Sequence, residues 1–269
     1  MRTIAVCAVL CALAVSSVGY GWGSLNDIRY KIKGEDGNLW EPLIGGGRTV
    51  TGHERPGTLT LTFDDGPDHR TTPIILDILD RHHVKGAFFI NATKIHLKTA
   101  GGVENQAVLR DVYRRGHFIG SHTFSHKDIT LLDDAGWQAE VRQTEQVILS
   151  ILGRRPWIFR PPFGRTNEKT SAQLLREGYT QVLWNLDSGD WKAPSAATIL
   201  RNVQRIIEES PDGGVLLFHD TNRSTVEALP LIFEWLDERN DARSAAGKPT
   251  LEIVGIDAYV HRNGRGGRR

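Results

Sequence analysis

Short apolar runs alternate with longer helical patterns along this chain from Gly57 onward. The apolar runs are rich in β-branched and aromatic residues, whereas the segments between them show the three- to four-residue apolar spacing of amphipathic helices. We expect strands at 58–63, 87–91, 117–120, 157–160, 180–185, 215–218 and 251–254. We expect helices at 73–83, 105–115, 133–152, 168–177, 196–209 and 226–238.

This alternation predicts an α/β fold in which helical crossovers join parallel strands. Seven strands in one repeating scheme favour a barrel, complete or incomplete, over an open sheet. In such barrels the chemistry lies in the loops at the carboxyl ends of the strands. Conspicuous polar residues fall at or just after these ends: Asp64, Asp65, His122, His126, Arg160, Asp187, Asp190 and His219.

Two adjacent carboxylates, Asp64 and Asp65, end the first strong strand pattern. Neighbouring side chains on a regular strand face opposite ways, so both can enter one pocket only if the strand ends there. The following Gly66 and Pro67 supply that end. Two carboxylates this close repel each other unless a cation takes one of them. A polar turn after an edge strand is the alternative explanation of the same residues.

His122 and His126 are four residues apart, which on a helical turn brings two imidazoles to one face. Together with Asp65 they would form a two-histidine, one-carboxylate metal site with open positions for water and substrate. Zinc is the expected metal, although the same ligands suit cobalt, nickel or iron. An isolated histidine pair of this spacing is a weak signal, and the aspartate at a strand end strengthens it.

If Asp65 binds the metal, Asp64 is free to act as a general base, and Arg160 could hold it ionised. A structural ion pair at a strand end would place Arg160 in the same way. Asp190 and His219 follow later strands, and a carboxylate bonded to an imidazole favours the imidazolium, which can donate a proton. A histidine buried in the core for structural reasons is the alternative for His219.

Aromatic residues accompany these polar positions. Phe163, Trp184 and Trp191 could line a sugar-binding groove, although aromatic residues near strand ends also serve as core.

The amino-terminal segment has the layout of a secretory signal peptide. Arg2 precedes an apolar run at 3–15 and small residues up to Gly19, which predicts a signal at 1–19, with a retained anchor as the alternative. Both cysteines of the chain, Cys7 and Cys11, lie within it, so the exported chain would rely on its core and not on disulfides. We expect a secreted or periplasmic protein with no membrane span after cleavage.

Charge gives no reason to expect nucleic acid as a partner, since 32 basic and 32 acidic residues remain once Arg2 is removed. An irregular extension at 20–56 and a basic, disordered tail at 261–269 are expected to flank one domain at 57–260. We expect a monomer.

Five motifs in order carry a resemblance to a known family. These are Thr62-Phe-Asp-Asp-Gly-Pro67, His122-Thr-Phe-Ser-His126, Arg160-Pro-Pro-Phe163, Asp187-Ser-Gly-Asp-Trp191 and Leu216-Leu-Phe-His-Asp220. They resemble the motifs of the polysaccharide deacetylase family, also known as the NodB homology domain or carbohydrate esterase family 4. The resemblance covers 57–260.

The resemblance implies a distorted (β/α) barrel of about seven parallel strands, a divalent metal, and hydrolysis of N-acetyl or O-acetyl groups from a polysaccharide. It implies that Asp65, His122 and His126 bind the metal and that Asp64 is the base. It also implies that Arg160 tethers Asp64, His219 is the acid and Asp190 tunes it. The backbone N–H of Phe163 would stabilise the oxyanion. Relatives often have tyrosine at this position, and the segment 93–105 is longer than usual.

Three other functions fit parts of this pattern. A related amidase could act on a small amide or cyclic ureide, an iron-dependent oxygenase could use the same ligands, and a non-catalytic module could bind glycans. Export argues against the first, the second needs a cosubstrate site, and intact Asp64 and His219 argue against the third.

Overall fold

A computed structural model describes residues 48–99 and 101–260 of the 269-residue chain. The expected signal peptide at 1–19, most of the expected extension at 20–56 and the basic tail at 261–269 lie outside the described residues.

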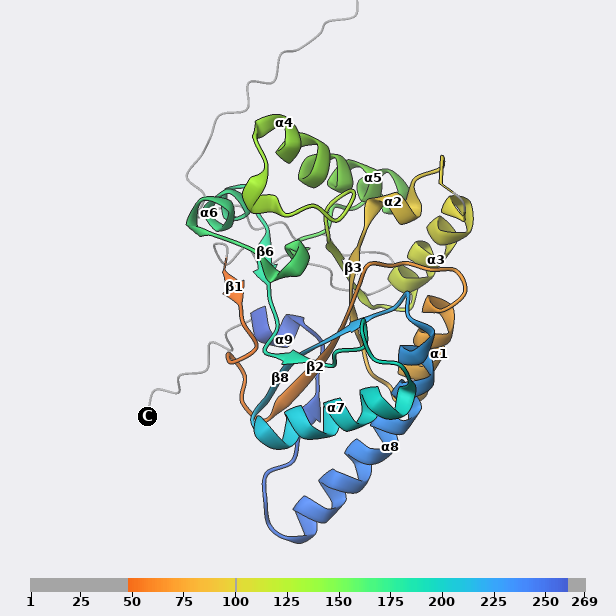
Figure 1. The fold of residues 1–269 in the computed structure, drawn as a ribbon, viewed down its shortest axis with the longest axis vertical. Coiled ribbons are helices and arrows are strands. Elements are labelled where there is room, and N and C mark those ends of the chain that lie inside the picture. Colours follow the sequence, from red (N-terminus) through yellow and green to blue (C-terminus); the bar gives the residue numbers. More distant parts are fainter. Residues whose placement is uncertain (1–47, 100, 261–269) are drawn as a thin grey trace, which may run out of the picture.

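The described chain is built on one sheet in which every strand pair is parallel. Its order is β1-β6-β5-β4-β3-β2-β8-β7, with β9 paired beside β2. The strands are β1 Thr49–Val50, β2 Thr58–Asp64, β3 Ala87–Ile90, β4 Phe118–Ser121, β5 Ile158–Phe159, β6 Thr180–Val182, β7 Leu186–Asp187, β8 Gly213–His219 and β9 Glu252–Ile253. The expected α/β fold with a distorted barrel of parallel strands is confirmed, and the sheet curls without pairing its end strands β1 and β7 (Figure 1).

Two strands go beyond the expected set. β1 lies within the segment that we expected to be irregular, and it pairs with β6. The strand expected at 180–185 ends at Val182, and the chain pairs again at Leu186 in β7, on the other edge of the sheet. Asn185 explains the break, because its side chain accepts from the Val215 N–H at 2.8 Å and donates to the Gly213 carbonyl at 3.0 Å. These bonds turn the chain toward β8.

Helices cover the sheet, as Figure 1 shows. They are α1 Thr72–Arg81, α2 Ala92–Ile95, α3 Gly102–Arg114, α4 Asp134–Trp137, α5 Gln143–Leu152, α6 Glu168–Arg176, α7 Ala196–Glu209, α8 Arg223–Ala245 and α9 Asp257–Val260. Three short turns complete the set: η1 Ile129–Leu131 and η3 Pro162–Gly164 are 3-10 turns, and η2 Gln138–Arg142 is a π-helical turn between α4 and α5. None of the helices in the described ranges is long and apolar enough to cross a membrane.

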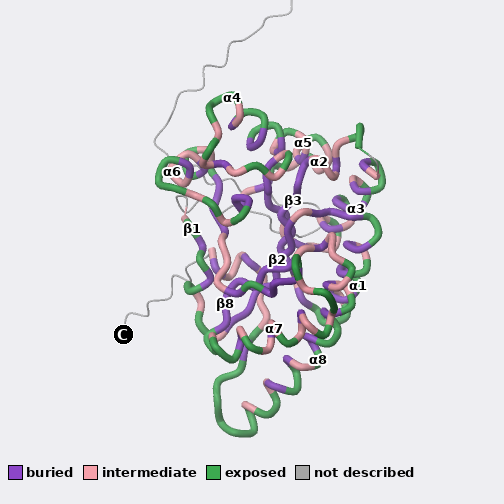
Figure 2. Tube along the Cα trace, in the orientation of Figure 1, coloured by how far each residue is buried: buried purple, intermediate pink, exposed green. Residues whose placement is uncertain are grey.

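The centre of the fold is β2, whose residues are all buried between β3 and β8 (Figure 2). Phe63 stacks on Phe88 of β3 and Phe218 of β8, with ring centroids 4.9 and 5.8 Å apart. Burying aromatic rings of this size is a large source of stability in a domain core. The packing fixes β2, and with it the position at which Asp64 leaves the sheet.

Candidate active site and metal centre

β2 ends between two neighbouring carboxylates, as the sequence predicts. The strand stops at Asp64, Asp65 has a left-handed backbone with φ of 71°, and a cis peptide bond joins Gly66 to Pro67. Only glycine fits at position 66, because a Cβ there would lie 2.1 Å from Oδ2 of the buried Asp220. The turn lets both side chains serve one site.

Asp65 lies beside His122 and His126, and the three form a group that could hold a metal ion. The Asp65 Oδ1 atom is 3.7 Å from His122 Nε2 and 3.4 Å from His126 Nε2. His122 Nδ1 is 2.8 Å from the Arg160 carbonyl, which can only accept, so this nitrogen carries the proton. The Nε2 lone pair is therefore left to face Asp65, and burial lowers the pKa of His122, which favours the neutral ring.

These residues fit a divalent cation. Asp65 Oδ1 is buried and has no hydrogen-bond partner within the described ranges, which is costly for a carboxylate oxygen unless something else satisfies it. Two ligand atoms at about 2.1 Å from one tetrahedral ion lie about 3.4 Å apart, which is close to the observed spacing. Two imidazoles and a carboxylate are ligands common to zinc, iron, cobalt and nickel, so the donor set admits each of them.

The segment that carries both histidines is a loop, so the expected helical turn at 122–126 is wrong. Thr123 and His126 have φ of 65° and 62°, values that a helix excludes. Asp65 and Phe163, at 71° and 61°, share this left-handed conformation. Apart from His83, these are the only non-glycine residues of the described chain with positive φ. Such strain gathers at functional sites, where the surrounding structure enforces it.

Asp64 forms a buried ion pair with Arg160, which follows β5. Arg160 Nη1 is 2.9 Å from Asp64 Oδ1, and both side chains are almost wholly shielded from solvent. Burial raises the pKa of Asp64, while the charge and hydrogen bond of Arg160 oppose that rise. The second carboxylate oxygen, Oδ2, lies 3.7 Å from His122 Nε2 and so faces the metal group.

The Arg160 guanidinium has further partners that fix it in place. It donates to the carbonyls of Val182 and Leu183 and to the Thr62 hydroxyl, and it lies 4.2 Å over the Phe89 ring. Sequence reasoning missed Thr62. The two-residue period of a strand places Thr62 and Asp64 on one face of β2, and this was the signal that could have found it.

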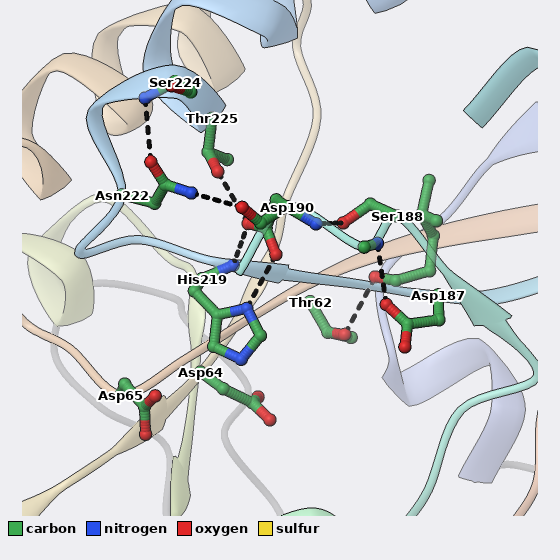
Figure 3. A network of polar contacts seen from close by, with 12 residues as sticks. Thr62, Asp64, Asp65, Asp187, Ser188, Asp190, His219, Asn222, Ser224 and Thr225 are labelled. Carbon is green, nitrogen blue, oxygen red and sulfur yellow. Dashed lines mark hydrogen bonds and ion pairs between the residues drawn. The ribbon is translucent and has the colours of Figure 1, made fainter. Parts of the chain in front are cut away.

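Asp190, which is buried, and His219, which is partly exposed, form a second pair, which Figure 3 shows beside Asp64 and Asp65. His219 donates to Asp190 twice, at 2.7 Å from the ring Nδ1 and at 2.7 Å from the backbone N–H. Thr225 also donates to Asp190, at 2.6 Å, and no sequence signal indicated it, because its partner lies 35 residues away on another element. The free ring nitrogen of His219 faces Asp64 and Asp65.

The environment of His219 favours the imidazolium. Burial lowers its pKa, but the hydrogen bond and charge of Asp190 and the charges of Asp64 and Asp65 outweigh burial and raise the pKa to about 9. The side chain keeps 17% of its surface exposed, so a substrate atom can reach it. At neutral pH the ring therefore holds a proton that it can donate.

Two aromatic residues are exposed around these pairs. Phe163 is 58% exposed and meets the His126 ring edge-on at 4.6 Å, and Trp191 is 62% exposed directly after Asp190. Trp184 is placed differently, since its ring lies over the Arg160 guanidinium at 5.4 Å. The first two offer apolar surface to a ligand, whereas Trp184 supports the ion pair beneath.

Comparison with known proteins agrees with this arrangement. The family model described as polysaccharide deacetylase matches residues 51–182. A peptidoglycan-N-acetylglucosamine deacetylase of Bacillus cereus is 30% identical over 232 residues, which is 82% of this chain and 79% of the relative. The chain belongs to the polysaccharide deacetylase family. A chitin deacetylase of Arthroderma benhamiae is 33% identical over 185 residues, 68% of this chain and 48% of the relative.

Solved structures of deacetylases share the fold. A T48 deacetylase with substrate has a TM-score of 0.62 and 31% identity, and the match covers 76% of this chain and 90% of that deacetylase. A peptidoglycan N-acetylglucosamine deacetylase has a TM-score of 0.66 and 27% identity, and covers 84% of this chain and 100% of its own. The family resemblance expected from the five motifs is confirmed.

Proposed function

We propose that this protein is an exported, metal-dependent deacetylase that removes N-acetyl or O-acetyl groups from a carbohydrate polymer. One observation carries this proposal: three features meet at the carboxyl end of the strands. They are a group that could hold a metal ion, Asp65 with His122 and His126, and the acid–base pairs Asp64–Arg160 and Asp190–His219. Relatives named as deacetylases of peptidoglycan and of chitin support a polysaccharide as substrate. The apolar segment at 3–15 supports export.

Asp65, His122 and His126 would hold the metal, for which we propose zinc. A cation of this kind supplies Lewis acidity, which polarises a carbonyl and makes water a better acid. The chain itself prepares the ligands, because the Arg160 carbonyl fixes the proton of His122 on Nδ1 and the turn after Asp64 presents Asp65.

Asp64 would act as the general base. Its Oδ1 is bonded to Arg160, so Oδ2 is the oxygen free to accept a proton from the attacking water. Arg160 keeps the carboxylate ionised and prevents it from turning away. A positioned general base contributes on the order of 10²–10⁴-fold in rate.

His219 would act as the general acid. The water oxygen forms a new bond to the acetyl carbon, and the bond from the acetyl carbon to the sugar's nitrogen or oxygen breaks. Nε2 of the imidazolium then gives its proton to the departing amine or alcohol, and acetate is released. Asp190 accepts the hydrogen bond from Nδ1–H of His219 and so keeps Nε2 directed toward the leaving group.

Phe163 would contribute in two ways. Its backbone has φ of 61° beside His126, which supports its N–H as the donor to the developing oxyanion. Its exposed ring, together with Trp191, offers faces for sugar stacking. Two exposed aromatic residues, one beside His126 and one directly after Asp190, suit a polymer better than a small amide.

Acetate release from acetylated peptidoglycan, chitin, xylan and an acetylated exopolysaccharide tests this function. We expect release from at least one polymer, loss after metal removal by a chelator, and recovery on addition of Zn²⁺. A small amide serves as the matched substrate control and should turn over slowly. Full activity in the stripped protein or in Asp64→Asn, or binding of polymer without any release, would contradict the proposal.

A further inference from the structure

The loop that carries His126 is strained, and only part of what holds it belongs to the site described above. From one side, the backbone N–H groups of Ala92 and Thr93 donate to the carbonyls of Thr123 and Phe124 at 3.2 and 2.9 Å. These bonds fix the first half of the loop. The second half contains Ser125 and His126, and His126 has a left-handed backbone.

Glu140 holds the second half from the other side. Its Oε2 accepts from the Ser125 N–H at 2.8 Å, and its Oε1 accepts from the Ser125 hydroxyl at 2.6 Å. Lys127 Nζ lies 3.3 Å from the same Oε1. A single carboxylate therefore contacts both chain neighbours of His126.

Glu140 is an unusual residue to find in this position. It is 3% exposed, and a carboxylate is rarely buried unless it is paired and hydrogen-bonded. It lies in the π-helical turn η2, where the Gln143 N–H bonds to the Gln138 carbonyl five residues back. Such turns are rare and occur often at functional sites.

The helix that begins in α4 and runs through η2 into α5 turns one face inward. Trp137, Glu140, Val141 and Thr144 are buried on this face, at the three- and four-residue spacing of an amphipathic helix. The Thr144 hydroxyl donates to the Glu140 carbonyl at 2.7 Å and so supports the π-helical backbone. Glu140 thus lies on the buried face, where its carboxylate reaches Ser125.

We propose that Glu140 is a positioning residue for the metal ligand His126, which it orients through Ser125. This inference rests on the proposed metal site. Glu140 does not touch the ligand group, so its action would be to fix the strained backbone that aims the His126 imidazole at Asp65. Partners of this kind typically contribute 10–100-fold to metal affinity.

A variant series separates positioning from general stability. Glu140→Met removes both acceptors at similar volume, whereas Glu140→Gln keeps one acceptor for the Ser125 N–H and gains a donor for the Ser125 hydroxyl. Glu145→Met is the matched control, because Glu145 lies in the adjoining α5 but bonds Tyr179 and Arg155 and not the loop. Ser125→Ala removes one of the two loop bonds without changing the helix.

The measurement is Zn²⁺ affinity by competition with a chromophoric chelator, with the visible absorption spectrum of the Co²⁺-loaded protein as a second readout. We expect Glu140→Met to bind Zn²⁺ about 10–100-fold more weakly and to change the Co²⁺ spectrum. Ser125→Ala should weaken binding about fivefold. Glu140→Gln and Glu145→Met should bind as the wild type does.

The outcomes distinguish this inference from the proposed function. If the wild type binds no Zn²⁺, or if His126→Ala binds as well as the wild type, the proposed metal site fails. If His126→Ala loses binding but Glu140→Met binds as tightly as Glu145→Met, only the positioning role is overturned. Should Glu140→Met fail to fold, Ser125→Ala decides alone, and unchanged affinity and spectrum in that variant would overturn the role.

Discussion

The Asp64–Arg160 and Asp190–His219 pairs of the site differ in the cation that each contains. Asp64 of β2 and His219 of β8 are partners in register, so the two pairs lie at the ends of neighbouring strands. Arg160 is wholly buried, and the partners of its guanidinium include a carboxylate, a hydroxyl and two carbonyls. Among the described residues the His219 ring donates to Asp190 alone, and it remains partly exposed.

This difference teaches how one edge of a sheet can hold a base and an acid together. A guanidinium stays protonated at any physiological pH, so the Arg160 pair keeps a fixed charge beside Asp64. An imidazolium can lose its proton. The hydrogen bond and charge of Asp190, with the charges of Asp64 and Asp65, outweigh burial and raise the pKa of His219 to about 9, so this pair can deliver a proton. We infer that the first pair maintains a base and the second supplies an acid.

The largest expected effect comes from removing the charge of the base. Asp64→Asn keeps an oxygen for Arg160 but cannot accept a proton from water. We expect kcat for acetate release to fall on the order of 10²–10⁴-fold. Zn²⁺ affinity measured on the same sample should stay close to wild type, because the proposed ligands are unchanged. A fall in Zn²⁺ affinity that matches the fall in kcat would show that Asp64 acts as a ligand and not as a base.

The next effect is on stability and tests whether the Arg160 cation is needed to balance the buried charge of Asp64. Arg160→Met leaves Asp64 buried without its counter-charge, which should lower the free energy of unfolding by about 3–5 kcal/mol. Denaturant unfolding measures it. The double variant Asp64→Asn with Arg160→Met should recover part of that loss, since no lone buried charge remains. If the double variant is no more stable than Arg160→Met alone, Asp64 is protonated or solvated when Arg160 is absent.

Sequence patterns predicted the sheet well where local and tertiary preferences agree. The residues of β2 and of α7 are buried or amphipathic with the right period, and both elements lie where the pattern placed them. α8 runs from Arg223 to Ala245, well beyond the expected 226–238, because Pro230 and a polar carboxyl-terminal half obscure its period. β7 was missed because Asn185 makes its decisive bonds with β8, which no local pattern records.

In the candidate site, too, local patterns were readable in the sequence and tertiary contacts were not. Residues whose chemistry is conspicuous at a strand end, such as Asp65 and His219, could be selected from the sequence. The side chains that hold them could not, because Thr225 and Glu140 look like ordinary helix residues until the fold brings them to Asp190 and Ser125. The helical turn expected at 122–126 was wrong because tertiary bonds to the loop override the four-residue spacing.

A smaller effect, on pH dependence, tests the titrating pair. If His219 is the proposed acid, the reaction needs its protonated form, so the rate should be high below its pKa and fall as pH rises through about 9. Asp190→Asn removes the charge that raises this pKa, so the falling limb should move to lower pH by one to three units. Acetate release measured from pH 6 to 10 checks it. A falling limb unchanged in Asp190→Asn would exclude His219 as the titrating acid.

The smallest effect concerns two exposed rings, Phe163 next to His126 and Trp191 directly after Asp190. Phe163→Ala keeps the backbone N–H and removes a stacking face, so KM for a polymer should rise about two- to tenfold with kcat nearly unchanged. We expect a similar rise in KM for Trp191→Ala. If one polymer chain contacts both rings independently, the double variant should multiply the two effects. If either ring alone accounts for the whole change in KM, the polymer stacks on that ring only, and the proposed contact with the other ring is wrong.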